Sequence, residues 1–176
     1  MQLRLHQPED QAWLPALYSR PEVARYLLDD PWTHEDTDKN LTQRIAKTGL
    51  ESPSGALAVV VEHNGRAIGD VALWLTDRSR GQAEIGWVLD PDHGGQGFAT
   101  EAVQAVLNLG LHHYQLHRII AQMDDRNAGS AALAKRVGMR LEAHHVQDWY
   151  SKGQWTNTLV FACLRNDECD PSHSSV

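Results

Sequence analysis

Residues 82–102 read QAEIGWVLDPDHGGQGFATEA, and this stretch decides the fold that we expect. Residues 82–89 have the apolar content of a strand. Residues 90–97 hold three glycines and a proline, which is typical of a loop, and residues 98–111 place apolar side chains at helical spacing. The pattern therefore predicts a strand, a glycine-rich loop and a helix, in that order.

The segment before this stretch predicts an antiparallel meander. Residues 56–62 and 67–75 are apolar runs joined by His63-Asn64-Gly65-Arg66, and an Asn-Gly pair is a strong signal for a tight hairpin. A polar turn at 77–81 leads into the strand at 82–89. Nearer the N-terminus we expect a short strand at 3–6, a helix over 8–18 and a second helix over 33–50, whose apolar face is weak.

The segment after it alternates between strands and helices. We expect a strand at 119–123, a helix at 128–137 that ends at Gly138, and strands at 141–146 and 158–164. The full order, β-α-α-β-β-β-α-β-α-β-β, predicts an α/β (α+β) fold with helices on a mixed sheet. We expect one domain over residues 1–165 and a polar tail over residues 166–176.

Composition excludes several classes of protein. Hydrophobic residues make up 41% of the 176 residues and charged residues 22%, which is the balance of a soluble globular protein. The net charge of −7 argues against a nucleic-acid partner, and no apolar run approaches the roughly 18 residues of a membrane span. Two cysteines, Cys163 and Cys169, lack the spacing of a zinc site and are too few for a disulfide framework. We therefore expect a cytoplasmic protein with no membrane partner.

The glycine loop, Gly94 to Ala99, lies between a strand and a helix, where unpaired amides favour an anion. A tight turn into a helix, with no ligand, is the alternative interpretation. An ordinary ATPase is excluded because no GxxxxGK[ST] motif occurs. A dinucleotide-binding loop would need a small residue where Thr100 stands, and it would follow the first strand of a βαβ unit rather than a meander.

At this point the chain resembles a known family. Residues 84–91 and 95–102 look like the acetyl-CoA site of GNAT N-acyltransferases. Further similarity, to the ribosomal-protein N-terminal acetyltransferase-like (RimJ/RimL) branch, lies at Leu116 to Ile119, at Asn127 and Ser130, at Gly138-Met139 and at Gly153 to Trp155. Three positions depart from the usual pattern: Gly94 stands for Arg or Gln, Asn157 for Asp and Phe161 for Tyr.

The resemblance implies acetyl-CoA as the acyl donor and no metal. Backbone groups of Trp87, Val88 and Leu89 would pair with the pantetheine arm, with the Val88 amide near the thioester oxygen. The pyrophosphate would lie on the loop formed by Gly94, Gly95, Gln96, Gly97, Phe98, Ala99 and Thr100. Asn127 would contact the pantetheine and Ser130 would lie near the CoA sulfur, although helix capping explains both residues equally well.

Acyl transfer from a thioester to an amine needs a neutral amine, a donor for the developing oxyanion and a proton source for the thiolate. Glu84 is the carboxylate nearest the expected reaction centre, and it is a candidate base if burial raises its pKa. A structural role for Glu84 is the alternative, and Asp70 and Asp148 are other candidates for the base. Ser130 is the candidate proton donor, with Tyr150 as the phenolic alternative.

The amine is expected to lie against aromatic and acidic side chains, a combination that suits a cation. The candidates are Trp32 with Asp29 and Asp30 beside it, and Asp148, Trp149 and Tyr150. His113 and His117 have the spacing of two metal ligands on a helix, but no third ligand follows in the pattern, so we expect no metal. An apolar surface formed by Trp155 and the last strands would support a homodimer interface.

The sequence therefore predicts an N-acetyltransferase that moves an acetyl group from acetyl-CoA to a primary amine by direct attack. The amine belongs to a protein or peptide N-terminus or to a small molecule. Two alternatives stay open. One is an aminoglycoside, other small-amine or succinyl-CoA-dependent acyltransferase, and the other is a non-catalytic acyl-CoA-binding regulatory module.

Overall fold

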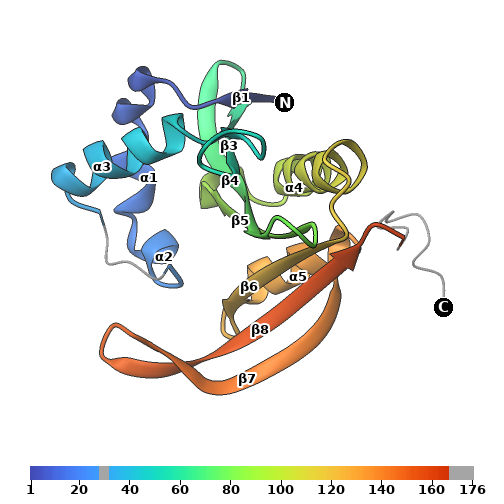
Figure 1. The fold of residues 1–176 in the computed structure, drawn as a ribbon. Coiled ribbons are helices and arrows are strands. Elements are labelled where there is room, and N and C mark those ends of the chain that lie inside the picture. Colours follow the sequence, from blue (N-terminus) through green and yellow to red (C-terminus); the bar gives the residue numbers. More distant parts are fainter. Residues whose placement is uncertain (28–31, 167–176) are drawn as a thin grey trace.

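The computed structural model describes residues 1–27 and 32–166, built around one mixed sheet (Figure 1). Asp29, Asp30, Cys169 and the expected tail from residue 167 onward lie outside the described residues. The strands follow the order β1 (Gln2–Leu5), β3 (Ala56–His63), β4 (Arg66–Asp77), β5 (Gln82–Leu89), β6 (Arg118–Asp124), β8 (Gln154–Leu164) and β7 (Arg140–Ser151). A two-residue strand, β2 (Thr48–Gly49), pairs with β3. Only the pairing of β5 with β6 is parallel among these strands.

Helices cover both faces of the sheet. Figure 1 shows α1 and α3 on one side of β3 to β5, and α4 on the other side. Each side has its own apolar cluster, one around α4 and one in which Leu14, Leu17, Tyr18, Trp32 and Leu41 pack together. The helical segments are η1 (Pro8–Ala12), α1 (Leu14–Tyr18), α2 (Pro21–Ala24), α3 (His34–Ile45), η2 (Pro91–His93), α4 (Phe98–Asn108), η3 (Leu109–His113) and α5 (Ala128–Arg136). None of the helices in the described ranges is long and apolar enough to cross a membrane.

The predicted α/β mixed-sheet fold and the order of its main elements are confirmed. Strand β5 has the predicted bounds, and α4 begins at Phe98 as expected. In the hairpin between β3 and β4, Asn64 and Gly65 have φ angles of 49° and 73°. Two successive positive φ angles are what a tight two-residue hairpin turn requires.

The structure differs from prediction in the first half of the chain. The helix expected over 8–18 is a 3₁₀ turn followed by the short helix α1, because Pro15 in the first turn of α1 has no N–H to continue a longer helix. Helix α3 ends at Ile45, and the chain then pairs with β3 as β2. The short helix α2 was not predicted.

The last two strands are much longer than predicted. Strand β7 runs to Ser151 and β8 begins at Gln154, so they form a long hairpin that extends beneath α2 in Figure 1. The outer half of β7 is exposed on both faces, and it therefore lacks the alternation that marks a half-buried strand. Near the hairpin tip, Lys152 Nζ donates to the carbonyl oxygens of Ala24 and Leu27, and this contact joins the hairpin to the end of α2.

Candidate functional site

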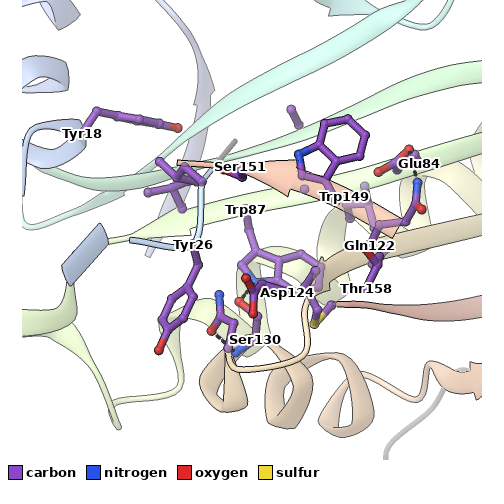
Figure 2. Close-up of a pocket in the computed structure, with 18 of the residues that line it drawn as sticks. Tyr18, Tyr26, Glu84, Trp87, Gln122, Asp124, Ser130, Trp149, Ser151 and Thr158 are labelled. Carbon is purple, nitrogen blue, oxygen red and sulfur yellow. Dashed lines mark hydrogen bonds between the residues drawn. The ribbon is translucent and has the colours of Figure 1, made fainter. Parts of the chain in front are cut away.

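The main cleft opens where β5 and β6 separate. The two strands pair only over Gln82–Glu84 and Arg118–Ile120, although β5 continues to Leu89 and β6 to Asp124. A cavity of about 700 Å³ begins there, bounded by α1, α3, β4, β5, β6 and the β7–β8 hairpin (Figure 2). It is lined by eight of the residues that the sequence predicted for the site: Trp32, Glu84, Trp87, Val88, Asn127, Ser130, Asp148 and Trp149.

In this gap, no strand of the described residues pairs with the backbone groups of β5 beyond Glu84. The Asp90 N–H donates to the Ile68 carbonyl on β4 at 2.8 Å, and Asp70 lies opposite Val88 in the same ladder. Hydrogen-bonded pairs alternate along an antiparallel ladder. By this alternation the N–H and C=O groups of Trp87 and Leu89 face the gap, whereas those of Val88 face β4. The Val88 N–H was expected to face the gap, near the thioester oxygen. In the structure it faces β4, because β5 has no bulge at Val88 that would turn it toward the gap.

Glu84 lies at the point where the strands part. It forms the last pair of the β5–β6 ladder, opposite Ile120, and its side chain lines the cleft. Burial raises the pKa of Glu84, and a hydrogen bond from Gln122 Nε2 to its Oε2 at 3.2 Å opposes that shift. No ion pair to a cation holds this carboxylate in the described residues, so it can take up a proton more readily than an ordinary glutamate.

Ser130 lies in the first turn of α5 and lines the same cleft as Glu84. Its backbone N–H donates to Asn127 Oδ1 at 3.1 Å, which confirms that Asn127 caps the helix. Its hydroxyl oxygen accepts a hydrogen bond from Trp87 Nε1 at 3.2 Å. A serine hydroxyl has one proton to donate and two lone pairs. The contact with Trp87 occupies a lone pair and leaves the proton available to a group in the cleft.

The glycine loop leads from β5 into α4 and does not line the cleft. Gly95 and Gly97 have φ angles of 73° and 87°, and a Cβ added at either position would meet no atom within 4 Å. Glycine is therefore needed there for its left-handed backbone rather than for space. The loop ends at the N-terminus of α4, where free amides favour an anion.

The residues that were predicted to bind the amine do not all lie in the cleft. Trp32 is 8% exposed and stacks on Tyr18, with ring centroids 4.0 Å apart, while one side of it lines the cleft. Trp149 and Asp148 also line the cleft, from the β7–β8 hairpin. Tyr150 does not, because its ring lies against Trp155 on the exposed side of the hairpin. Its assignment to the substrate site, and its role as an alternative proton donor, are therefore not supported by the geometry.

A buried charged cluster forms the wall of the cleft next to α1. Tyr18 Oη donates to Asp70 Oδ1 at 2.6 Å, and Arg44 Nε donates to Asp70 Oδ2 at 2.8 Å. Burial opposes the ionisation of Asp70, but the charge of Arg44, the contact with buried His6 at 3.5 Å and the hydrogen bond from Tyr18 outweigh it, and the pKa of Asp70 falls to about 2. A carboxylate this acidic is a poor base, so Asp70 is unsuited to the role that the sequence left open for it.

Sequence reasoning missed the contribution of α3 to this site. Its side chains Asn40, Gln43 and Arg44, and Lys47 just after it, line the cleft. The one signal was the weak apolar face of the helix, which looked like exposure to solvent. Gln122 on β6 and Tyr26 were also missed, and Figure 2 shows them on opposite sides of the cavity.

The histidine pair does not have the helical arrangement that its spacing suggested. Segment η3 ends at His113, and His117 lies in the turn that leads to β6. Within residues 1–27 and 32–166, no three His, Cys, Asp or Glu side chains are grouped in a way that could hold a metal ion.

Known proteins are similar to this chain in sequence and in fold. The family described as Acetyltransferase (GNAT) domain matches residues 1–140. The uncharacterized N-acetyltransferase YnaD of Bacillus subtilis (strain 168) is 36% identical over 149 residues, covering 85% of this chain and 84% of YnaD. RimL, an alpha-N-protein acetyltransferase solved in complex with coenzyme A, superposes with a TM-score of 0.81 at 22% identity, over 92% of each chain. Spermidine N-acetyltransferase from Vibrio cholerae, solved with CoA and spermine, gives 0.79 at 19% identity, over 93% of this chain and 95% of that one.

Proposed function

Because the chain belongs to the GNAT acetyltransferase family, we propose that its cleft binds a primary amine and that Glu84 and Ser130 assist the transfer of the acetyl group from acetyl-CoA. The observation that carries this assignment is the position of Glu84. It is a carboxylate with a raised pKa, it has no cationic partner in the described residues, and it lies where β5 leaves β6.

The donor would enter between β5 and β6. Its pantetheine arm is a chain of amides, and the free backbone groups of Trp87 and Leu89 offer it the hydrogen bonds that a neighbouring strand would otherwise make. Its pyrophosphate would lie on the loop from Gly94 to Thr100, against the N-terminal amides of α4. Because Gly94 has no side chain to contact a phosphate, the backbone carries more of that binding here.

The chemistry joins the amine nitrogen to the acetyl carbon and breaks the bond between that carbon and sulfur. Glu84 would accept the proton that the ammonium must lose, directly or through water, because a raised pKa brings a carboxylate nearer to the range of a useful base. Backbone N–H groups of β5 in the gap would stabilise the oxyanion as it develops. Ser130 would give its proton to the departing thiolate and regain one from the nitrogen, which must lose a second proton after the attack, and Trp87 would orient the hydroxyl.

The acceptor is the open part of this proposal. RimL acts on a protein N-terminus and the Vibrio cholerae enzyme on spermidine, so the shared fold does not choose between a peptide and a small amine. An aminoglycoside or other small-amine acceptor and a succinyl donor are the alternatives to these acceptors and to the acetyl group. The cleft holds both acidic and basic side chains.

Calorimetric titration with acetyl-CoA, with free CoA and NAD as comparisons, tests the donor. We expect saturable binding of acetyl-CoA and none of NAD. Thiol release in the presence of a panel of amines and N-terminal peptides then tests catalysis. Tight acetyl-CoA binding without thiol release for any amine would favour a non-catalytic acyl-CoA-binding module, and binding of NAD equal to that of acetyl-CoA would contradict the donor assignment.

We also propose that the protein works in the cytoplasm and forms a homodimer through the β7–β8 hairpin. Strand β7 is the last strand of the sheet, and Val146, Tyr150 and Trp155 are exposed by 71%, 60% and 59%. Exposed apolar side chains beside a free strand edge favour pairing with another chain. Light scattering of the protein and of Trp155→Ser tests this proposal, since a monomeric mass for the unaltered protein would contradict it.

A further inference from the structure

A row of very small side chains crosses the sheet beneath α3. Ala58 on β3 lies opposite Ala72 on β4, and Ala72 lies opposite Gly86 on β5. Residues directly opposite one another share a face of the sheet, so these three residues form one line that ends at the gap. All three line the cleft.

Larger side chains flank this row on both sides. The row before it holds Trp74 and Glu84, and the row after it holds Asp70 and Val88. The Trp74 ring reaches over Gly86, because a Cβ built on Gly86 would lie 3.3 Å from Trp74 Cη2. The small residues therefore form a trough about two strand spacings long, roughly 10 Å, whose floor is covered at Ala58, which is 1% exposed, and is open mainly at Ala72. We call this feature the Ala-Gly trough.

Lys47 closes the far end of the trough. The Ala58 N–H donates to the Lys47 carbonyl at 2.8 Å, which extends the pairing of Thr48 with Leu57 by one residue. Lys47 thus takes the next place in the row after Ala58, and its half-buried side chain lines the same cleft.

The Lys47 ammonium is a charge that the described residues around it neutralise only in part. Neighbouring Arg44 is bound to Asp70 and Tyr18, and Asp124 in the same cleft is bound to Arg126. No side chain of the described residues pairs with Lys47. Burial and the charge of Arg44 lower the pKa of Lys47, and the charge of Asp70 opposes them only in part, so a bound anion would supply compensation that the ammonium still lacks. Glu84 supplies the opposite charge at the gap end of the trough.

We propose that Lys47 binds an anionic group of the acceptor, so that the acceptor is a primary amine with a carboxylate or phosphate at its far end. The inference rests on the proposed function, because it places the reacting amine beside Glu84 in the gap. A narrow chain would pass the Trp74 ring beside Gly86, lie over Ala72 and reach Lys47 at the closed end. A polyamine in the same place would bring a second cation next to Lys47, which is unfavourable.

The test compares amines of equal length that differ at one end. Values of kcat/KM are measured for ω-aminohexanoate, hexylamine and hexamethylenediamine with the unaltered protein and with Lys47→Gln, Lys47→Arg and Lys39→Gln. Lys39 is an exposed lysine of α3 and is the matched control. We expect ω-aminohexanoate to exceed hexylamine by roughly 10- to 100-fold, the range typical of a hydrogen bond to a charged group. Lys47→Gln should abolish this ratio, whereas Lys47→Arg and Lys39→Gln should keep it.

Further arms separate the causes of a change. The phosphonate analogue of ω-aminohexanoate identifies the anion, since the faster of the two acids shows which one Lys47 prefers. Ala72→Leu fills the trough, and it should lower kcat/KM for all three amines while the affinity for acetyl-CoA stays unchanged. A preference for the diamine, or an acid-to-amine ratio unchanged by Lys47→Gln, would overturn the inference. If either of these results is obtained while hexylamine is acetylated, the role of Lys47 is wrong but the proposed acetyltransferase function stands. If acetyl-CoA binds and no amine reacts, the proposed acetyltransferase function is itself wrong.

Discussion

Trp87 on β5 donates a hydrogen bond from its indole nitrogen to the hydroxyl of Ser130 on α5, over 3.2 Å. The two residues lie on opposite sides of the gap between β5 and β6, so this bond fixes the hydroxyl at the place where the acyl donor would pass. Because the Ser130 oxygen is the acceptor in this bond, its hydroxyl proton stays available for donation to another group.

Replacing either partner of this bond should slow the reaction without loosening the donor. Ser130→Ala removes the proposed proton donor, and we expect kcat to fall by roughly 10²-fold, at the lower end of the range for general acid catalysis. Trp87→Phe keeps a ring but loses the orienting bond, so a smaller fall in kcat is expected. Single-turnover thiol release measures both effects. An unchanged kcat for Ser130→Ala would exclude it as the proton source.

Glu84 should control the acidic side of the pH profile. A base must be deprotonated, so kcat/KM should fall as the pH drops through the raised pKa of Glu84. Glu84→Gln should reduce kcat/KM by roughly 10²- to 10⁴-fold and remove that acidic limb. A limb that persists in Glu84→Gln would assign it to another group.

Gln122 offers a finer test of the same carboxylate. Its hydrogen bond to Glu84 holds the pKa down against the effect of burial. Gln122→Ala should therefore move the acidic limb to higher pH while the plateau rate changes little. A purely structural role for Gln122 would lower the plateau and leave the position of the limb unchanged, so the pH profile separates the two roles.

Asp70 should make the free energy of unfolding depend on acidic pH. Its pKa is about 2 in the folded protein and about 3.9 in an unfolded chain, so its contribution is fully present above about pH 4 and is lost as the pH falls toward 2. The size of this contribution is about 2–3 kcal/mol. Asp70→Asn should remove it and leave Arg44 without its carboxylate partner, and urea unfolding at several pH values measures both effects. Asp38→Asn, on the exposed side of α3, is the control for the loss of one carboxylate at the surface.

The glycine loop should be sensitive to backbone conformation rather than to bulk. Gly97→Ala puts a Cβ into open space at a φ of 87°, so it should cost about 1 kcal/mol of backbone strain and weaken acetyl-CoA binding several-fold. Gln96→Ala between the two left-handed glycines is the matched control, and it should bind acetyl-CoA normally. Equal affinity for Gly97→Ala and the unaltered protein, measured by calorimetry, would argue against a role for this loop in holding the donor.

Local signals were sufficient for the centre of the fold but not for its edges. Asn64-Gly65 and the run from Gln82 to Leu89 predicted their elements because turn chemistry and alternation depend on neighbouring residues. The outer part of β7 has no buried face, so nothing in its own sequence marks it as a strand. Its pairing with β8 is interrupted after Leu141 and after His145, which disturbs the alternation further.

The residues of the candidate site that belong to local sequence motifs were predictable. Glu84, Trp87 and Ser130 lie within or close to recognisable motifs, whereas Lys47 and Arg44 follow from packing. A polar helix face looks the same in sequence whether it faces water or a cleft. The place of Lys47 beside Ala58 depends on a pairing between β2 and β3 that involves only two residues of β2. Such a contact is visible only in three dimensions.

The short seam between β5 and β6 has a mechanical consequence. Three residue pairs connect the part of the sheet that contains β1 to β5 with the part that contains β6 to β8 (Figure 1). A donor that forms hydrogen bonds with the unpaired edge of β5 would lie between the two parts of the sheet and restrict their relative motion. It would raise the melting temperature by mass action, and it would slow hydrogen exchange at the amides of Trp87 and Leu89 more than at that of Val88. In that case the stiffness of the protein would itself report whether the donor is bound.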